Sequence, residues 1–357
     1  RICATVLLLL ALAAFADAFI GSSPLLLRNN AKRVQPAARA ARTTTLSFSP
    51  KMTATTGEEV EEEVAAAGLL PADRYIACNR FTVRDGAGPR FEKRWAERKS
   101  SIATLEGFKF FTLLRRCDDM PDVSKNDGSL KVYPEGTPDY MSMTWWQNRK
   151  TFNSWRTGFA FKEAHGGGSL AGFLGAMLGS MMVLKDAPLP AMFEGLVAES
   201  VSRGGSPIVL KGRNAEGKAE ADGVEALPAE CFVAMNRFNV KAGCEKDFET
   251  IWQNRESTLK ETKGFVAFTV LRAPNTGSKA TPPGGPFGQD GINYSTCSVW
   301  DSKESWMQWF ADSKKEGGSH KSAAPREGPP LKDLLNGPPS PLFWDGLLAL
   351  ESKDGAQ

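Results

Sequence analysis

A stretch that occurs twice decides the fold of this chain of 357 residues. Residues 79–115 read NRFTVRDGAGPRFEKRWAERKSSIATLEGFKFFTLLR, and residues 236–272 read NRFNVKAGCEKDFETIWQNRESTLKETKGFVAFTVLR. The two segments align without a gap and share the NRF triplet, a Phe-Glu pair, a tryptophan and a final Leu-Arg. The match continues in two further pairs of segments: 143–155 with 297–309, and 190–200 with 341–352. We therefore predict a tandem repeat of one unit of roughly 120 to 130 residues.

Each copy is predicted to run strand, helix, strand, strand, helix, strand. The first strands are rich in β-forming residues, and a glycine-containing turn follows each of them: residues 75–83 and 231–240. The first helices are predicted from apolar residues at near-helical spacing, which we expect to pack in the core: Phe91, Trp95, Ile102 and Leu105 in one copy, and Phe248, Trp252 and Leu259 in the other. The remaining strands are predicted from Gly107 and Gly264, over 140–146 and 294–300, and over 193–200 and 343–352.

The order βαββαβ predicts a ferredoxin-like α+β unit with helices over one face of its sheet. The other face of the sheet also needs a cover, and a second copy in the same chain supplies it by packing sheet against sheet. The predicted fold is an intramolecular dimeric α+β barrel made of two such repeats. The predicted boundaries are domain 1 at 73–200, a linker rich in glycine, alanine and charge at 201–228, and domain 2 at 229–352.

Residues 1–70 are predicted to be a targeting region. Residues 1–18 contain an apolar run of signal-peptide length that ends in small residues. Residues 19–70 begin with a stretch of transit-peptide composition, which lacks acidic residues as far as Met52, and end in a disordered acidic segment. The junction ADAFIG resembles the bipartite presequence of algae with complex plastids, so the expected location is the plastid. The alternative is a secreted protein with a disordered pro-segment.

Composition argues against several kinds of function. The 44 Lys and Arg against 41 Asp and Glu leave a net charge of only +3, and nucleic acid is not an expected partner. The six cysteines form no CxxC pair, which argues against a structural zinc site or a disulfide framework. The segment GAGPRF is not a GxGxxG after a strand, so a flavin or dinucleotide cofactor is not expected.

The first copy carries an uncharged, glycine-rich insertion, Gly166–Leu184, that has no match in the second copy. We interpret it as a buried helix or an apolar lid beside a pocket. A transmembrane span is the alternative, but the length is borderline and the glycine content is high, so no span is expected in the mature protein.

The repeated asparagine is the first candidate site residue. Strand alternation places Asn79 on the same face as Ala77 and Phe81, and it places Asn236 on the equivalent apolar face of the second copy. Burying an amide without partners costs about 1–3 kcal/mol. Each asparagine is therefore expected either to serve a ligand or to tie its strand to a loop.

The chain has only two histidines: His165 lies on the predicted second helix of the first copy, and His320 follows the same helix in the second copy. On a regular helix, Trp155 and His165 would lie about 15 Å apart along the axis and some 80° apart around it, so both would border one broad, flat ligand. His320 follows Trp309 by eleven residues, behind the segment EGGS. A histidine ring with a free nitrogen is the usual proximal ligand of haem iron.

The strand asparagine and the spacing W-x9-H on the second helix resemble the antibiotic-biosynthesis-monooxygenase superfamily. Within it, FNSWRTGFAFKEAH at residues 152–165 is similar to the IsdG-type haem-degrading monooxygenases. The resemblance implies that His165 ligates haem iron, that Asn79 donates a hydrogen bond toward the distal oxygen ligand, and that Trp155 presses on the porphyrin and ruffles it. By the same resemblance, Asn236 and Trp309 would be the equivalent catalytic residues, and His320 the second iron ligand.

The resemblance implies a haem-degrading monooxygenase, with haem as both substrate and cofactor and with O2 and an external electron donor as further requirements. In the second copy two glycines precede His320, and each disfavours helix by about 1 kcal/mol, so its ligand geometry differs from that of His165. Three alternatives stay open: a cofactor-independent oxygenase acting on an aromatic or quinone-like compound, a non-enzymatic haem- or tetrapyrrole-binding protein, and a purely structural barrel.

Overall fold

The computed structural model of the chain describes residues 64–98, 100–123, 125, 127–164, 175, 179–201, 214, 218–255, 257–273, 287, 291–315 and 328–352. The predicted signal and transit segments, most of the predicted insertion Gly166–Leu184, and both predicted iron ligands, His165 and His320, lie outside the described residues. Within the described residues no helix is both long enough and apolar enough to span a membrane.

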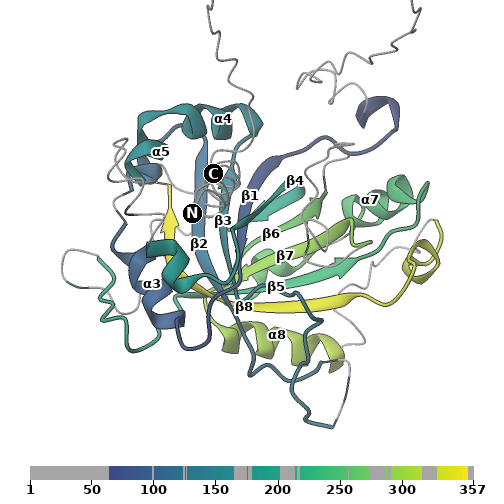
Figure 1. Cartoon of the computed structure of the whole chain (residues 1–357). Helices are drawn as coiled ribbons and strands as arrows, with labels where there is room; N and C mark the ends of the chain where they lie inside the picture. The colour runs from purple at the N-terminus through teal and green to yellow at the C-terminus, as the bar shows by residue number, and fades with distance from the viewer. Residues whose placement is uncertain are drawn as a thin grey trace, which may run out of the picture.

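Eight antiparallel strands form a closed barrel in the order β1-β3-β2-β8-β5-β7-β6-β4 (Figure 1). Their bounds are β1 Arg74–Phe81, β2 Phe108–Arg116, β3 Tyr140–Trp146, β4 Leu189–Ser200, β5 Cys231–Phe238, β6 Phe265–Arg272, β7 Tyr294–Trp300 and β8 Ser340–Glu351. Each repeat contributes four neighbouring strands in equivalent order, β4-β1-β3-β2 and β8-β5-β7-β6. The repeats join where the last strand of one pairs with the second strand of the other, β2 with β8 and β4 with β6. This confirms the predicted intramolecular α+β barrel.

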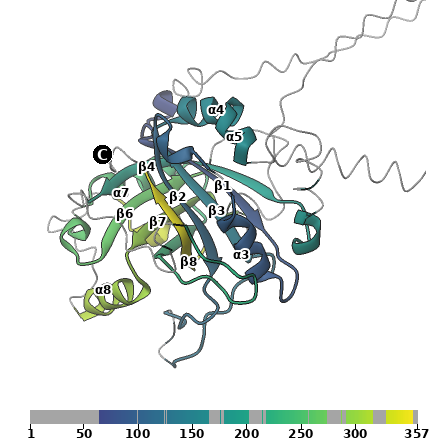
Figure 2. The same ribbon diagram turned by 90° about the vertical axis from the view of Figure 1, so that its left-hand side faces the viewer.

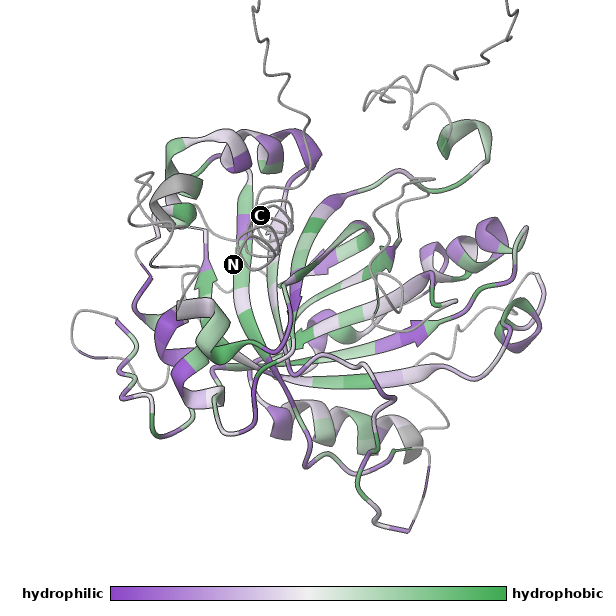
Figure 3. Cartoon of the chain, in the orientation of Figure 1, coloured by the Kyte–Doolittle hydropathy of each residue, from purple (hydrophilic) through white to green (hydrophobic). Residues whose placement is uncertain are grey.

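The helices lie outside the barrel. Their bounds are α3 Gly88–Ala96, α4 Arg149–Thr157 and α5 Phe159–Ala164 in the first repeat, and α7 Glu245–Gln253 and α8 Lys303–Lys315 in the second. Figure 2, turned by 90°, shows α3 beside the strands of the first repeat and α8 beside those of the second. In Figure 3 the helices alternate between hydrophilic and hydrophobic residues, as expected for helices with one face packed on a sheet.

The first helix of each repeat is shorter than predicted. Ile102 lies in a separate 3-10 helix, η1 (Ile102–Thr104), and Leu105 follows it, so neither belongs to α3. At the start of η1, Ser100 Oγ accepts the backbone N–H of Ile102 at 3.4 Å, a local bond that takes the place of a helical one. The second repeat breaks in the same way, with Leu259 in the 3-10 helix η2 (Leu259–Glu261); a third short helix, η3, covers Leu331–Leu334.

Strand β1 separates two environments. Ile76 and Cys78 belong to the cluster inside the barrel, whereas Ala77 and Phe81 pack under the helices outside it. Asn79 alternates with these residues and therefore faces the helices, as strand alternation predicts. The layer between sheet and helices is thus where the chain can expose a polar group to a ligand.

Buried charges join the two repeats in a symmetric pattern. In the first repeat Arg115 donates to Glu92 of α3 at 3.0 Å and to Asp345 of β8, on the other repeat, at 3.0 Å. Tyr140 donates to the same Glu92 oxygen at 2.8 Å, and the backbone N–H of Leu227 donates to the other.

In the second repeat Arg272 joins Glu249 to Glu194 of β4, with Arg–Glu distances of 2.8 and 2.6 Å. Tyr294 and the backbone N–H of Leu70 complete this set, each donating to Glu249 at 2.6 Å. Each set therefore bonds a helix of one repeat to the last strand of the other.

Candidate functional site

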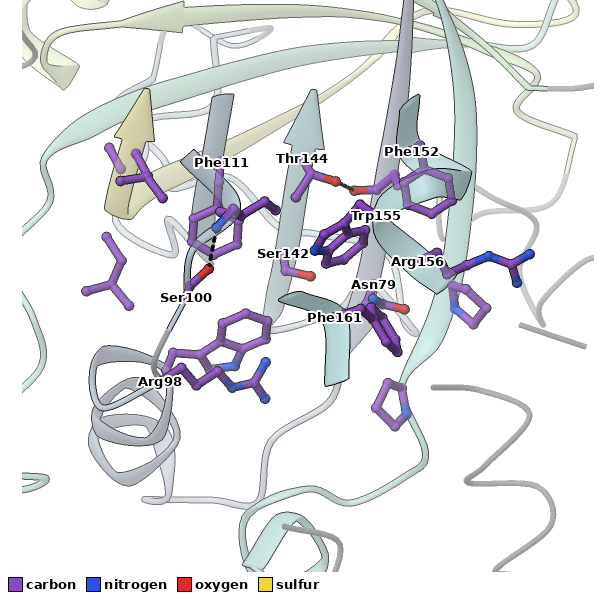
Figure 4. Close-up of a pocket in the computed structure, with 18 of the residues that line it drawn as sticks. Asn79, Arg98, Ser100, Phe111, Ser142, Thr144, Phe152, Trp155, Arg156 and Phe161 are labelled. Carbon is purple, nitrogen blue, oxygen red and sulfur yellow. Dashed lines mark hydrogen bonds between the residues drawn. The ribbon is translucent and has the colours of Figure 1, made fainter. Parts of the chain in front are cut away.

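A cavity of about 540 Å³ lies between the sheet of the first repeat and its outer helices (Figure 4). Its floor comes from the outward faces of β1 and β3, and its walls from α4, α5 and the end of α3. A cavity of this size is in the range of small-molecule sites. The second repeat contributes as well, because Leu348 and Leu350 at the end of β8 line the same cavity. A bulge in β8, with Leu348 at a φ of 53°, turns this strand end over the first repeat.

Helix α4 carries the tryptophan that the sequence singled out. The helix starts at a capping box in which Asn148 accepts the backbone N–H of Thr151 at 3.0 Å, and this fixes the direction of its apolar face. The half-buried Trp155 ring lies 5.4 Å from Trp146 and 5.0 Å from Phe161, measured between ring centroids. Trp155 and Phe161 both line the cavity, so one wall is aromatic.

The helix predicted to carry both Trp155 and His165 is broken, so the prediction of one regular helix, from which the separation of 15 Å and 80° was calculated, is wrong. Gly158 is in an extended conformation, with φ −85° and ψ 178°, and it divides α4 from α5. Its N–H bonds to the carbonyl of Trp155, three residues back, which tightens the last turn and ends the helix. Glycine disfavours helix by about 1 kcal/mol relative to alanine, which favours the break here. Residue 165 directly follows α5 in the sequence.

Asn79 lies on the floor of this cavity. It is half-buried, and among the described residues nothing hydrogen-bonds to its side-chain amide. A neighbouring polar side chain is hydrogen-bonded within the sheet: the hydroxyl of Thr144 donates to the carbonyl of Ala77 at 3.0 Å. An amide without a partner among the described residues, on a floor whose other polar side chains are Ser142 and Thr144, is suited to one directed hydrogen bond with a ligand.

The polar rim of the cavity is basic. The charged residues in its lining are all cationic: Arg98, Arg149, Arg156 and Lys218. Arg98 stacks its guanidinium 3.7 Å above the ring of Trp95. Burial, with a smaller effect of the nearby Arg94, lowers the pKa of Arg98 to about 10, so it remains a cation at neutral pH.

The second repeat carries aromatic rings, packed on one another, at three positions equivalent to residues that line the cavity. Trp306 of α8 lies 4.9 Å from Phe343 and 5.1 Å from Phe310, between ring centroids. In the first repeat, the alignment of the two copies gives Phe152, Met192 and Arg156 at these three positions. At these positions the first repeat therefore has a smaller or a charged side chain where the second repeat has a larger aromatic ring.

The candidate residues of the second repeat are Asn236 and Trp309. Asn236 is exposed, unlike the half-buried Asn79. Trp309 packs 5.2 Å from Trp300, much as Trp155 packs on Trp146. The structure therefore brings Asn79 and Trp155 to one cavity, and it gives Asn236 and Trp309 a different setting.

Sequence reasoning missed most of the other residues around the cavity. Arg98 had a visible signal, because the gapless alignment repeats it as Arg255. Lys218 and Leu350 had none, since they reach the cavity from the linker and from the other repeat. The described residues include no cluster of His, Cys, Asp and Glu suited to hold a metal ion.

Comparisons with known proteins agree with this architecture. The family described as "Antibiotic biosynthesis monooxygenase" matches residues 74–167 and 231–281, one segment in each repeat. The protein named "Heme oxygenase (mycobilin-producing)", from two strains of Mycobacterium tuberculosis, is 30% identical over 92 residues, which are 26% of this chain and 70% of that protein.

Two solved structures are similar over most of their length. An anthrone oxidase-like protein has a TM-score of 0.37 and 14% identity, covering 79% of this chain and 94% of that one. A monooxygenase-like protein from Listeria innocua has a TM-score of 0.29 and 10% identity, covering 78% of this chain and 95% of that one. Likenesses at these TM-scores carry no argument about fold or activity.

Proposed function

Because this chain belongs to the antibiotic biosynthesis monooxygenase family, we propose that it is a monooxygenase that binds and degrades haem in the cavity of its first repeat. The observation that carries the proposal is the cavity, which combines aromatic walls, a cationic rim and the unpartnered amide of Asn79. The name of the mycobacterial relative supports haem as the ligand.

The residues present fit such a molecule. Haem is a broad, flat ring with two carboxylates, so it needs an apolar slot with cations at the edge. Trp155 and Phe161 give the slot an aromatic side, and Arg98 and Arg149 provide cations that line it. When bound, haem supplies the iron at which dioxygen is activated, and it is also the substrate.

The chain's own residues bind and orient. We assign Asn79 the hydrogen bond from the cavity floor and Trp155 the packing contact that presses on the plane of the ring. His165 is our proposed iron ligand, because its ring nitrogen is the type of donor that haem iron takes and it directly follows α5. Electrons must come from an external donor, and the reaction consumes O2.

A titration tests the proposal. Purified protein without residues 1–63 is titrated with hemin, and the Soret band is recorded for the wild type and for His165→Ala. We expect a shifted, saturable Soret band in the wild type and a changed position in His165→Ala. His320→Ala is the matched control, and we expect it to give the wild-type spectrum. An unchanged spectrum in His165→Ala rules out ligation by that residue.

A second measurement separates enzyme from binding protein. Addition of ascorbate in air to the haem complex should bleach the Soret band if the ring is opened. A Soret band that persists under these conditions would indicate haem binding without turnover, and the absence of any haem complex would favour an oxygenase of aromatic or quinone-like compounds, or a structural barrel.

We also propose a plastid location. The apolar run within residues 1–18 and the absence of acidic residues from Phe19 to Met52 support a bipartite presequence. Fusing residues 1–70 to a fluorescent protein in an alga with complex plastids tests this, and secretion of the fusion would contradict it.

A further inference from the structure

The segment between the repeats forms part of the cavity wall. Lys218 and Ala219 belong to the residues predicted as a linker, yet both line the cavity of the first repeat. A single repeat on its own would lack this wall. The fusion of two repeats thus adds a structural part to the site, besides joining them.

Several contacts hold this segment on helix α3. The buried Leu227 donates its backbone N–H to Glu92, and Lys93 donates to the carbonyl of Asp222 at 3.3 Å. Ala221 packs against the core cluster beneath α3. Residues 221–227 are therefore anchored to the helix that ends next to Arg98, which fixes where Lys218 reaches the cavity.

The charges around Arg98 differ from those around its equivalent. In the second repeat Glu199 pairs across the sheet with Phe268, and its charge acts on Arg255. In the first repeat the same register position, opposite Phe111, is Leu350. At this register position the first repeat therefore has an apolar residue in place of the carboxylate that acts on Arg255.

We propose that Lys218 and Arg98 together bind the acidic group of a flat ligand, so that the segment joining the repeats selects anionic over neutral ligands. The inference rests on the proposed function only in taking this cavity as the ligand site. Among the described residues, the lining contains four cationic side chains and no aspartate or glutamate, so an anion meets no repulsion from a described lining carboxylate. For haem, the selected groups are the propionates.

Two fluorescent probes test the selection without haem. 8-Anilinonaphthalene-1-sulfonate and N-phenyl-1-naphthylamine share one ring system, and only the first carries an anionic group. We expect the wild type to bind the sulfonate more tightly. Arg98→Gln should weaken the sulfonate at least tenfold, because the ligand's charge loses a partly buried partner. Lys218→Glu should weaken it roughly threefold to fivefold, the range of an exposed ion pair.

The neutral probe and three further variants are the controls. Binding of N-phenyl-1-naphthylamine should stay unchanged in Arg98→Gln and Lys218→Glu, and Arg98→Lys should recover most of the sulfonate affinity. Lys260→Glu, at an exposed lysine of the second repeat, should behave as the wild type. Met192→Phe, which fills the cavity, should weaken both probes and so locate them there.

Three results would overturn the inference. They are equal wild-type affinity for the two probes, unchanged sulfonate binding in Lys218→Glu, and equal loss of both probes in Arg98→Gln. A selective loss of the sulfonate in a protein that shows no Soret complex with hemin would sustain the inference while refuting the proposed function. Parallel hemin and hemin dimethyl ester titrations then show whether the same selection applies to haem.

Discussion

The two repeats share one framework and differ in what fills the space under their helices. Both have the same strand order, and both bury a glutamate that binds an arginine, a tyrosine and a backbone N–H. In the first repeat that space holds a cavity; in the second, Trp306, Phe310 and Phe343 take the positions of three of its lining residues and pack on one another. The charged sets around Glu92 and Glu249 are thus common to both repeats, whereas the cavity lies in the first.

The second helix shows the same difference. Helix α8 is continuous over Lys303–Lys315, whereas the corresponding segment of the first repeat breaks at Gly158 into α4 and α5. The break moves the residues after Gly158 off the axis of α4. It also places Phe161 against Trp155 at 5.0 Å. A helix that no longer runs straight thereby forms an aromatic wall of the cavity.

The largest expected effect tests the symmetric part of the comparison. Glu92→Ala and Glu249→Ala should each lower the free energy of unfolding by about 3–5 kcal/mol, because each removes a buried carboxylate that binds an arginine, a tyrosine and a backbone N–H. Urea denaturation of both variants measures this. Losses below about 1 kcal/mol, or losses that differ widely between the two repeats, would contradict the view that the hydrogen-bonded sets around Glu92 and Glu249 are equivalent.

The next effect tests the asymmetric part. Met192→Phe introduces into the first repeat the residue that occupies the equivalent position, Phe343, in the second. It should weaken hemin binding at least tenfold, because the added ring occupies the slot, while overpacking costs only about 1–3 kcal/mol of stability. Phe343→Met is the matched change in the second repeat. Hemin binding as tight as in the wild type for Met192→Phe would show that the ligand lies elsewhere.

The smallest effect concerns alkaline pH. Burial and the neighbouring carboxylates of Glu92 and Glu249 raise the pKa values of Tyr140 and Tyr294 above the ordinary value near 10. A raised folded-state pKa stabilises the protein fully below the unfolded pKa, so this stability is lost as the pH rises above about 10. Thermal melts between pH 9 and 11.5 should therefore show a falling Tm.

Matched variants control for this tyrosine effect. In Tyr140→Phe and Tyr294→Phe the fall above pH 10 should be shallower by similar amounts, since the two sites are alike. If the Tm of the double variant falls above pH 10 as steeply as that of the wild type, groups other than these two tyrosines cause the alkaline loss of stability.

Much of the fold could be predicted from the sequence because the repeat is visible. The pair of NRF segments fixes the register of two equivalent units, and the alternation of β1 correctly puts Asn79 under the helices. The ends of the helices were harder to predict. Helix α3 ends at Ala96 and Ile102 starts a separate 3-10 helix, and Gly158 divides a segment that periodicity predicts as one helix.

The cavity itself could be predicted only in part. Asn79 and Trp155 follow from the repeat and from the family resemblance, and both line it. Lys218 reaches it from the linker and Leu350 from the far end of the other repeat, so tertiary packing determines both contacts. Whether each repeat has room for a ligand depends on the volumes of side chains that are far apart in the sequence. Only the packed structure shows which of these side chains are neighbours.

The most direct test of the central claim, that a single repeat holds the ligand, is the stoichiometry of hemin binding. Titration of a known concentration of the chain, followed by the Soret band, should reach its end point at about one hemin per chain. The end point should be the same in His320→Ala. Two hemins per chain, with the second lost in His320→Ala, would contradict the account.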